Sequence, residues 1–399
     1  MSLNSTPSAD RLHIAFFGKR NVGKSSLVNS VTSQKLAIVS DIKGTTTDPV
    51  LKAMEILPLG PVVIIDTAGI DDDGCLGELR IKRTYDILNK TDIAVLVVDC
   101  NTEIEQDELS LIEKFKQKGI PYIIAKNKSD LFTGNKSCSE NEIFVSAKTG
   151  ENINLLCKLI AKVAEPTTSN KRIVGHLLDK NDVVVLVIPI DSSAPKGRLI
   201  LPQQQTIRDI LDSNAIVVSV QPTELEETLK TLKIKPKMII TDSQAFKAVN
   251  KYAPSDIPLT SFSILFANYK GNLKTAVEGV LALENLKNDD TVLISEGCTH
   301  HRQCDDIGSV KLPMWISEYT GKKLNFEFTS GAEFSDELAK YNLIIHCGGC
   351  MLNEREIKYR LKCAADENIP MTNYGILIAY VNGILKRSVE IFPEIYNLL

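Results

Sequence analysis

The sequence GKRNVGKS at residues 18–25 limits the possible folds of this chain more than any other feature. It follows the apolar run LHIAFF and precedes a helix-like stretch. Glycines in such a loop let backbone N–H groups surround phosphate oxygens, and the helix N-terminus adds the positive end of its dipole. A strand, this loop and a helix in that order predict a nucleotide-phosphate site. Within it, Lys24 would reach the β- and γ-phosphates, and the Ser25 hydroxyl would bind Mg²⁺.

Three further motifs follow at the ends of apolar runs and together predict a guanine-nucleotide site. In DTAG, Asp66 would hold Mg²⁺ through water, and Gly69 could meet the γ-phosphate. In NKSD, Asp130 can accept hydrogen bonds from N1–H and N2–H₂ of guanine, two donors that adenine does not offer as a pair. SAK at residues 146–148 follows where it would brace the base. Each motif alone could be an ordinary turn, but their order and placement agree.

These motifs resemble those of the TrmE–Era–Der class of GTPases, over roughly residues 11–165. GTTTD at residues 44–48 resembles the switch I sequence of that class, which makes Thr46 the expected second hydroxyl ligand of Mg²⁺. Asn21 matches an asparagine that helps to hold K⁺ beside the phosphates in related GTPases. Ile70 follows DTAG, so the water-orienting glutamine that Ras-like enzymes have there is absent.

The resemblance implies slow, K⁺-stimulated hydrolysis of GTP, in which K⁺ supplies the charge that an arginine finger provides elsewhere. The residues expected to act in catalysis are Lys24, Thr46 and Gly69. The residues expected to contact the nucleotide or its ions are Gly18, Asn21, Gly23, Lys24, Ser25, Ser26, Thr46, Asp66, Gly69, Asn127, Lys128, Asp130, Ser146, Ala147 and Lys148. Of these, Ser25, Thr46 and Asp66 are the expected ligands of Mg²⁺, and Asn21 that of K⁺.

Strand-like and helix-like stretches alternate along the chain, which predicts an α/β fold whose mostly parallel sheet is covered on both faces. Residues 11–165 would form a P-loop GTPase domain, and the polar segment EPTTSNKR after it would be a linker. Two further α/β domains are predicted at residues 173–265 and 266–399, with no linker at their boundary. No tandem repeat is apparent.

Short apolar runs and polar turns locate the elements of the two later domains. Strands are expected at residues 182–190, 215–220, 237–241, 290–297, 322–329 and 342–347. Helices are expected at residues 203–213, 223–233, 243–252, 274–287, 333–341 and 352–368.

Two groups of potential metal ligands lie at the ends of strands in the third domain: EGCTHHRQC at residues 296–304 and HCGGC at residues 346–350. Because ligand sites in open α/β sheets gather beyond the carboxyl ends of the strands, we expect the two groups to meet. Cys298, Cys347 and Cys350 with one histidine would suit zinc. The same cysteines would suit a [4Fe–4S] cluster that leaves one iron to a weaker ligand. These residues by themselves leave both metals open.

An N-terminal GTPase domain followed by CTH and then HCGGC resembles the HydF family of [FeFe]-hydrogenase maturation GTPases over the whole chain. The resemblance implies that Cys298, Cys347 and Cys350 hold a [4Fe–4S] cluster in a cluster-binding third domain. The candidates for its exchangeable fourth ligand are Glu296, His300 and His346. Cys304 lies outside the signature.

The same resemblance implies a scaffold or carrier role. The chain would receive a transient diiron precursor of the hydrogenase H-cluster made with two radical-SAM maturases, and deliver it to apo-hydrogenase. The middle domain resembles the dimerisation domain of the family, which implies a homodimer. GTP would bias contacts with these partners through the loops around Thr46 and Gly69.

Composition disfavours several other classes of function. A formal net charge of −4 and a pI of about 5.9 disfavour nucleic-acid partners, which need Lys and Arg to neutralise phosphates. The longest apolar run, Val183–Ile190, is too short to span a bilayer, and the N-terminus lacks a signal pattern. Nine cysteines, an odd number, without such a signal argue against a disulfide framework. We therefore expect a cytoplasmic protein with no membrane partner.

Three alternative interpretations stay open at this point. The chain could be an RNA-modification or ribosome-assembly GTPase, although that predicts a basic appended domain. It could be a GTPase with a structural zinc module. The third possibility is a redox-sensing cluster that controls the GTPase.

Overall fold

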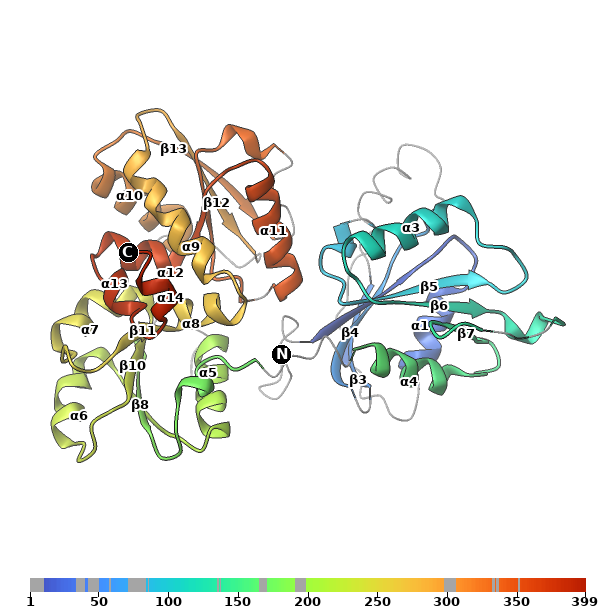
Figure 1. The fold of residues 1–399 in the computed structure, drawn as a ribbon, viewed down its shortest axis with the longest axis horizontal. Coiled ribbons are helices and arrows are strands. Elements are labelled where there is room, and N and C mark those ends of the chain that lie inside the picture. The colour runs from blue at the N-terminus through green and yellow to red at the C-terminus, as the bar shows by residue number, and fades with distance from the viewer. Residues whose placement is uncertain are drawn as a thin grey trace. The chain divides into compact units, whose positions relative to one another are not determined.

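The computed structural model describes residues 11–33, 40–41, 50–56, 59–70, 84, 86–134, 136, 138–164, 171–190, 199–297, 306–331, 334, 337–350 and 352–399. Thr46, Cys298, His300 and Cys304 lie outside these residues. The chain divides into two compact units, Met1–Asn170 and Lys171–Leu399 (Figure 1). Among the described residues, no helix is both long enough and apolar enough to cross a membrane.

The first unit contains a seven-stranded sheet with the order β2-β3-β4-β1-β5-β6-β7. Its strands are β1 (Leu12–Phe17), β2 (Ser40–Asp41), β3 (Val50–Ile56), β4 (Gly60–Asp66), β5 (Ile93–Asp99), β6 (Tyr122–Asn127) and β7 (Glu142–Phe144). The neighbouring strands β4, β1, β5, β6 and β7 run parallel, whereas β3 pairs antiparallel with both β4 and β2. The bounds of its longer helices are α1 (Lys24–Thr32), α3 (Gln106–Gln117) and α4 (Ile153–Ala164).

Helices cover both faces of this sheet (Figure 1). Successive side chains of a strand point to opposite faces, so Phe16 packs with α1 and α4 while Phe17 packs with α3. Strands that are buried on both faces are nearly continuous apolar runs, as in β1 and β5. The predicted α/β class and the P-loop domain are confirmed.

The second unit contains two parallel four-stranded sheets, with the orders β11-β10-β8-β9 and β13-β12-β14-β15. The first has β8 (Val183–Val187), β9 (Ile216–Val220), β10 (Met238–Thr241) and β11 (Leu259–Ser261); the second has β12 (Thr291–Glu296), β13 (Asn325–Ser330), β14 (Leu343–His346) and β15 (Met371–Asn373). The helices are α5 (Leu201–Asp212), α6 (Leu225–Thr231), α7 (Phe246–Tyr252), α8 (Phe262–Tyr269), α9 (Leu273–Val280), α10 (Leu312–Thr320), α11 (Glu354–Asp366), α12 (Tyr374–Val381), α13 (Leu385–Ser388) and α14 (Pro393–Tyr396).

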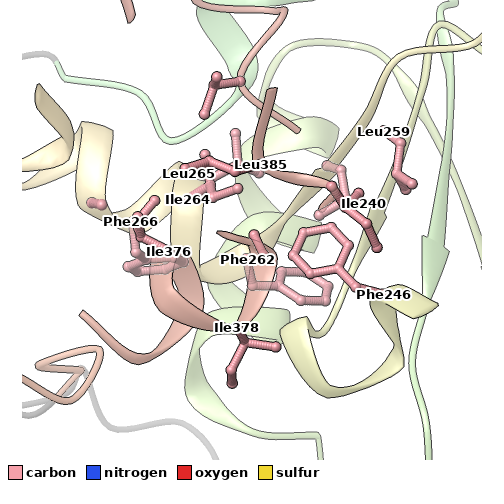
Figure 2. Close-up of a cluster of buried hydrophobic side chains, with 14 of the residues drawn as sticks. Ile240, Phe246, Leu259, Phe262, Ile264, Leu265, Phe266, Ile376, Ile378 and Leu385 are labelled. Atoms are coloured by element: carbon pink, nitrogen blue, oxygen red, sulfur yellow. The ribbon is translucent and has the colours of Figure 1, made fainter. Parts of the chain in front are cut away.

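One hydrophobic core joins both sheets of the second unit. Figure 2 shows its centre, where side chains of α8 and α12 pack together beside side chains of β10, β11 and α7. Phe262, Leu265 and Ile376 in this cluster are at most 2% exposed. This shared core explains why the sequence has no linker between residues 173–265 and 266–399.

The two sheets are built as copies of one arrangement, which corrects the expectation that the chain has no repeat. Residues 257–278 read IPLTSFSILFANYKGNLKTAVE, and residues 369–390 read IPMTNYGILIAYVNGILKRSVE. Both copies have the same strand order, and their registers agree: Thr241 lies opposite Val187, as His346 lies opposite Ser295. Divergence elsewhere hides the repeat in the sequence.

The two copies exchange helices. Helix α9 of the first copy packs on β15 of the second, and α13 of the second packs on β11 of the first. At the junction, a Cβ atom on Gly375 would lie 2.2 Å from the Cβ of Ser263, its equivalent in the first copy. Reciprocal packing and contact between equivalent positions are what a two-fold relation produces.

The remaining differences from the predicted elements have local causes. Of the helix expected at 333–341, the described residues contain only the single 3₁₀ turn Leu338–Lys340. Strands β11 and β15 are three residues each, too short for a recognisable period. Helix α12 is apolar on almost every side because it is buried, so it lacks the amphipathic pattern that would identify it.

Candidate functional site

The loop between β1 and α1 has the backbone conformation that its glycines permit. Gly23 has φ 90°, and a Cβ atom there would lie 2.4 Å from Nδ2 of Asn127. Gly18 has φ 144°, and a Cβ atom there would lie 2.2 Å from the carbonyl oxygen of Val97. Any side chain at either position would collide with a neighbour, so the loop requires both glycines.

Lys24 and Asn21 hold distinct positions in this loop. The Lys24 side chain lies inside it, where Nζ donates to the carbonyl oxygens of Gly18 (2.9 Å) and Lys19 (2.6 Å). Asn21 is exposed and has φ 58°, a conformation that asparagine tolerates better than most residues. The ammonium group of Lys24 is thus held at the centre of the loop and the Asn21 amide at its rim.

Asp66, at the end of β4, has the properties of a cation ligand. Its Oδ1 atom is buried and has no hydrogen-bond partner among the described residues. The Ser25 hydroxyl donates to the same carboxylate, which brings two of the three expected Mg²⁺ ligands together. Burial raises the pKa of Asp66, while Ser25 and Lys24 act in the opposite direction. A buried, incompletely satisfied carboxylate beside a hydroxyl fits Mg²⁺.

Asn127 connects the phosphate side of the site with the base side. It is 3% exposed, its Nδ2 donates to the carbonyl oxygen of Val22 (2.9 Å), and its Oδ1 accepts from the N–H of Ala147 (3.1 Å). The DTAG segment is attached to the same loop, since the N–H of Ile70 donates to the carbonyl oxygen of Gly18 (3.3 Å). Gly69 is buried beside it.

Asp130 is oriented by the SAK segment. The Ser146 hydroxyl donates to its Oδ1 (2.7 Å), and this bond holds the pKa of the exposed Asp130 carboxyl below its usual range. Lys128, with φ 65°, forms an ion pair with Asp99 (2.7 Å). Ser26 and Lys148 are exposed. An ionised carboxylate is thereby presented at the place predicted for guanine.

A second group of candidate residues gathers at the carboxyl ends of β12 and β14. Because these strands are parallel neighbours, with Ser295 opposite His346, the segments that follow them begin side by side. The backbone N–H of Gly297 donates to Sγ of Cys347 (3.1 Å), and that of Gly349 approaches the same sulfur at 3.4 Å. The two motifs predicted to meet are in direct contact.

Cys347 is half-buried, and its thiol lies against the backbone amides of Gly297 and Gly349. Burial raises its pKa, whereas the N–H groups of Gly297 and Gly349 lower it. Cys350 is half-buried. Within the described ranges, which omit residues 298–305, no three His, Cys, Asp or Glu side chains form a group that could hold a metal ion.

His346 is buried, and both of its ring nitrogens are engaged. Nδ1 donates to the carbonyl oxygen of Cys347 (2.7 Å), and Nε2 accepts from Arg360 (3.1 Å). Burial and the neighbouring Arg360 guanidinium lower the pKa of His346 to about 4. The imidazole is therefore neutral and its Nε2 lone pair is used by Arg360.

Glu296, the last residue of β12, is 4% exposed and faces the same region. It accepts a hydrogen bond from the hydroxyl of Tyr374 (3.3 Å). Its charge contributes to the raised pKa of Cys347, and burial raises the pKa of Tyr374. A buried carboxylate and a half-buried thiol thus lie close together, and a cation bound between them would stabilise this arrangement.

Two cationic residues near this site were not predicted from the sequence. Arg360 of α11 is 1% exposed and donates to His346, to Ser295 and to the carbonyl oxygen of Gly331 (2.9 Å). Lys270 is 6% exposed and donates to backbone carbonyl oxygens of the HCGGC segment and of Leu352 just after it. Arg360 lies on the apolar face of its helix, and a charged residue on such a face is a signal visible in the sequence. The sequence around Lys270 contains no comparable signal.

Comparison with known protein families identifies three parts of the chain. Residues 13–128 match the model described as a 50S ribosome-binding GTPase. Residues 173–271 match the hydrogen maturase F dimerization domain, and residues 274–391 match the hydrogen maturase F tetramerization domain. The chain belongs to the hydrogen maturase F family.

Membership of this family confirms the resemblance seen in the sequence of this chain. Its first unit is a GTPase domain that takes GTP or GDP with Mg²⁺. The second unit contains the oligomerisation domains of the family. The third predicted domain, which we expected to bind a cluster, corresponds to the part that the family model describes as a tetramerization domain.

Two individual relatives each match about two fifths of the chain. The tRNA modification GTPase MnmE of Legionella pneumophila (strain Paris) is 36% identical over 162 residues, 39% of this chain and 36% of the relative. GTPase Der of Wolinella succinogenes is 34% identical over 188 residues, 42% of this chain and 39% of the relative. This chain thus spans well under half the length of these relatives. The match to a solved structure of an Aquifex aeolicus Era variant bound to GDP.AlF4⁻ covers 55% of this chain and 98% of the Era chain. The sequence identity is 19% and the TM-score is 0.33.

Proposed function

We propose that this chain hydrolyses GTP and holds a [4Fe–4S] cluster on Cys298, Cys347 and Cys350, and that it acts as a scaffold or carrier in [FeFe]-hydrogenase maturation. It would deliver a diiron precursor of the H-cluster to apo-hydrogenase, working as a homodimer with radical-SAM maturases. We assign the cluster to residues 266–399 and dimerisation to residues 173–265.

The observation that carries this proposal is the 3.1 Å hydrogen bond from Gly297 to the sulfur of Cys347. It brings the CGGC segment to the peptide that directly precedes Cys298 in the sequence. Backbone amides that donate to a cysteine sulfur are typical of iron–sulfur sites, where they help to set the reduction potential. The residues present therefore suit the cluster that the family resemblance implies.

Among the candidates for a fourth ligand, we favour Glu296. His346 would have to give up its hydrogen bond with Arg360 before Nε2 could bind a metal. Glu296 ends β12 beside Cys347, and a carboxylate is a weaker ligand for iron than a thiolate. A cluster bound in this way supplies an iron whose protein ligand can be exchanged, and His300 stays a second candidate.

In the GTPase domain, the side chains described above would each bind a different part of the nucleotide or its Mg²⁺ ion. Lys24 would leave the carbonyl oxygens of Gly18 and Lys19 to bind the β- and γ-phosphates. Ser25 and Asp66 would hold Mg²⁺ together with Thr46, and Asp130 would select guanine. Gly69 would meet the γ-phosphate, a role supported by the hydrogen bond that attaches the neighbouring Ile70 to Gly18 of the phosphate loop.

The iron, sulfide and zinc content of anaerobically purified protein tests the cluster assignment. We expect about four irons and four sulfides per chain after iron–sulfide reconstitution, with an S = 1/2 EPR signal on reduction by dithionite. A variant with Ala in place of Cys298, Cys347 and Cys350 should lose both the iron and the signal. A variant with Ala in place of Cys138, an exposed cysteine of the first unit, is the matched control and should keep them.

Two results would contradict the proposal. Stoichiometric zinc that survives reconstitution would instead indicate a structural metal module. GTP hydrolysis that changes sharply on oxidation of the cluster would favour a redox sensor. In both cases the GTPase assignment would stand.

Potassium should stimulate GTP hydrolysis through Asn21. Replacing K⁺ with Na⁺ at constant ionic strength should lower kcat by about tenfold or more, because a cation beside the phosphates does part of the work of an arginine finger. Asn21→Ala should make the rate equally low in both salts. A wild-type rate that is the same in K⁺ and Na⁺ would remove Asn21 from this role.

A further inference from the structure

Lys270 crosses from the first copy of the repeat to the metal-binding segment of the second. It follows α8, whose first residue comes directly after β11. Its Nζ donates to the carbonyl oxygen of Gly349, between Cys347 and Cys350, and to that of Leu352 (3.0 Å). One side chain thus joins the turn that contains both cysteines to the residues that follow it.

These bonds constrain the orientation of the peptide groups in the segment. The carbonyl of Gly349 belongs to the same planar peptide as the N–H of Cys350, and in a trans peptide the two point in opposite directions. Fixing the carbonyl on Lys270 therefore fixes that N–H as well. Gly349 has φ 61°, and the N–H of Gly349 points to Cys347 Sγ, so the turn is held from both sides.

The repeat supplies an internal comparison. Alignment of the two copies places Asn382 at the position of Lys270, and each residue is the C-cap of its helix. Asn382 donates to the carbonyl oxygen of Ile378 (2.7 Å) within its own helix. The segment of the first copy equivalent to CGGC is DSQA at residues 242–245, which has no cysteine. A long cation is present only opposite the copy with the thiols.

Burial of this ammonium group needs a compensating environment. Lys270 is 6% exposed, and a cation that leaves water loses its hydration energy unless charges and hydrogen bonds replace it. Carbonyl dipoles replace part of that energy. Thiolates with a bound metal would replace more, and the positive charge would in turn favour electron uptake at that centre.

We propose that Lys270 is a positioning residue for the metal site: it holds the Cys347–Cys350 turn in its ligating shape and connects that turn to helix α8 of the first copy. The inference rests on the proposed function for the identity of the metal. The shape of the turn without metal can be tested independently of that function.

The first test needs no metal. Hydrogen–deuterium exchange in the metal-free protein should be about 10–100-fold faster over residues 347–352 in Lys270→Met than in the wild type. Lys274→Met, which removes an exposed lysine of α9, is the matched control and should exchange like the wild type. Unchanged exchange in Lys270→Met would overturn the inference.

The second test uses reconstituted protein and a ferrous chelator. Lys270→Met should lose iron about 10–100-fold faster than the wild type and take up an electron at a more negative potential. Lys270→Gln keeps a hydrogen-bond donor without the charge, so it should recover part of the retention of iron but none of the potential. Equal iron loss in Lys270→Met and the wild type would also overturn the inference.

The outcomes separate this inference from the proposed function. If the wild type holds no iron, the proposed function fails, while the exchange comparison still decides the role of Lys270. If Lys270→Met does not fold, as judged by its thermal transition and its mass in solution, Lys270→Gln takes its place in both tests. Exchange and iron loss that match the wild type in Lys270→Gln would then count against the role of Lys270.

Discussion

Replacing Lys24 with Met should lower the rate of GTP hydrolysis by about 100- to 1000-fold, the usual cost of removing a preorganised group that stabilises charge in the transition state. The Lys24 ammonium lies at the centre of the loop between β1 and α1, on the carbonyl oxygens of Gly18 and Lys19. Methionine has a similar length and no charge, so it should fill the space without binding phosphate. Phosphate release from purified protein under saturating GTP and Mg²⁺ measures the effect.

Lys158→Met provides the matched control for this experiment. Lys158 is exposed on α4 of the same unit, away from the residues that form the nucleotide site. Its loss should change the rate less than about twofold, since most surface substitutions have small effects. A Lys24→Met rate within a few-fold of the wild type would contradict the assignment of the phosphate site.

Replacing Arg360 with Met should destabilise the unit Lys171–Leu399 by about 3–5 kcal/mol, the usual cost of removing one partner of a buried ion pair. Arg360 is 1% exposed and pairs with Glu356 (2.8 Å). It also donates to His346 and to the carbonyl oxygen of Gly331. The variant would leave these acceptors buried without their donor. The shift of the urea-unfolding transition of this unit measures the loss.

Two further variants separate the ion pair from the general effect of changing α11. Lys358→Met removes an exposed lysine from the same helix and should cost at most about 1 kcal/mol. Arg360→Met combined with Glu356→Met should be less destabilised than Arg360→Met alone, because it removes the unpaired charge. An Arg360→Met transition that coincides with that of the wild type would show that the buried pair contributes little.

Much of the GTPase domain could be predicted because its requirements are local. A loop that surrounds phosphate needs glycine where a Cβ atom would collide with a neighbour, as at Gly18 and Gly23, so the chemistry is visible in consecutive residues. The apolar runs of β1 and β5 are equally visible, because a parallel strand buried on both faces has almost no polar positions.

The sequence also predicted that the segments after β12 and β14 would meet. Parallel neighbouring strands end at the same edge of a sheet, so residues far apart in the chain are brought together by a simple rule. That rule gives no hydrogen-bond partners. It placed His346 among the candidate ligands, whereas the structure engages both of its nitrogens, one of them with Arg360.

By itself, the sequence determined the class of the fold, the order of the nucleotide motifs and the groups of cysteines, because each depends on residues close together in the chain. Only the tertiary structure decided that two copies of one sheet share a core, exchange helices and place Lys270 against the CGGC segment. Those contacts join residues dozens of positions apart, and many side chains could satisfy the same local pattern. Packing and the burial of charge decide which of these side chains lie in contact. Both depend on tertiary contacts, which a local sequence pattern does not contain.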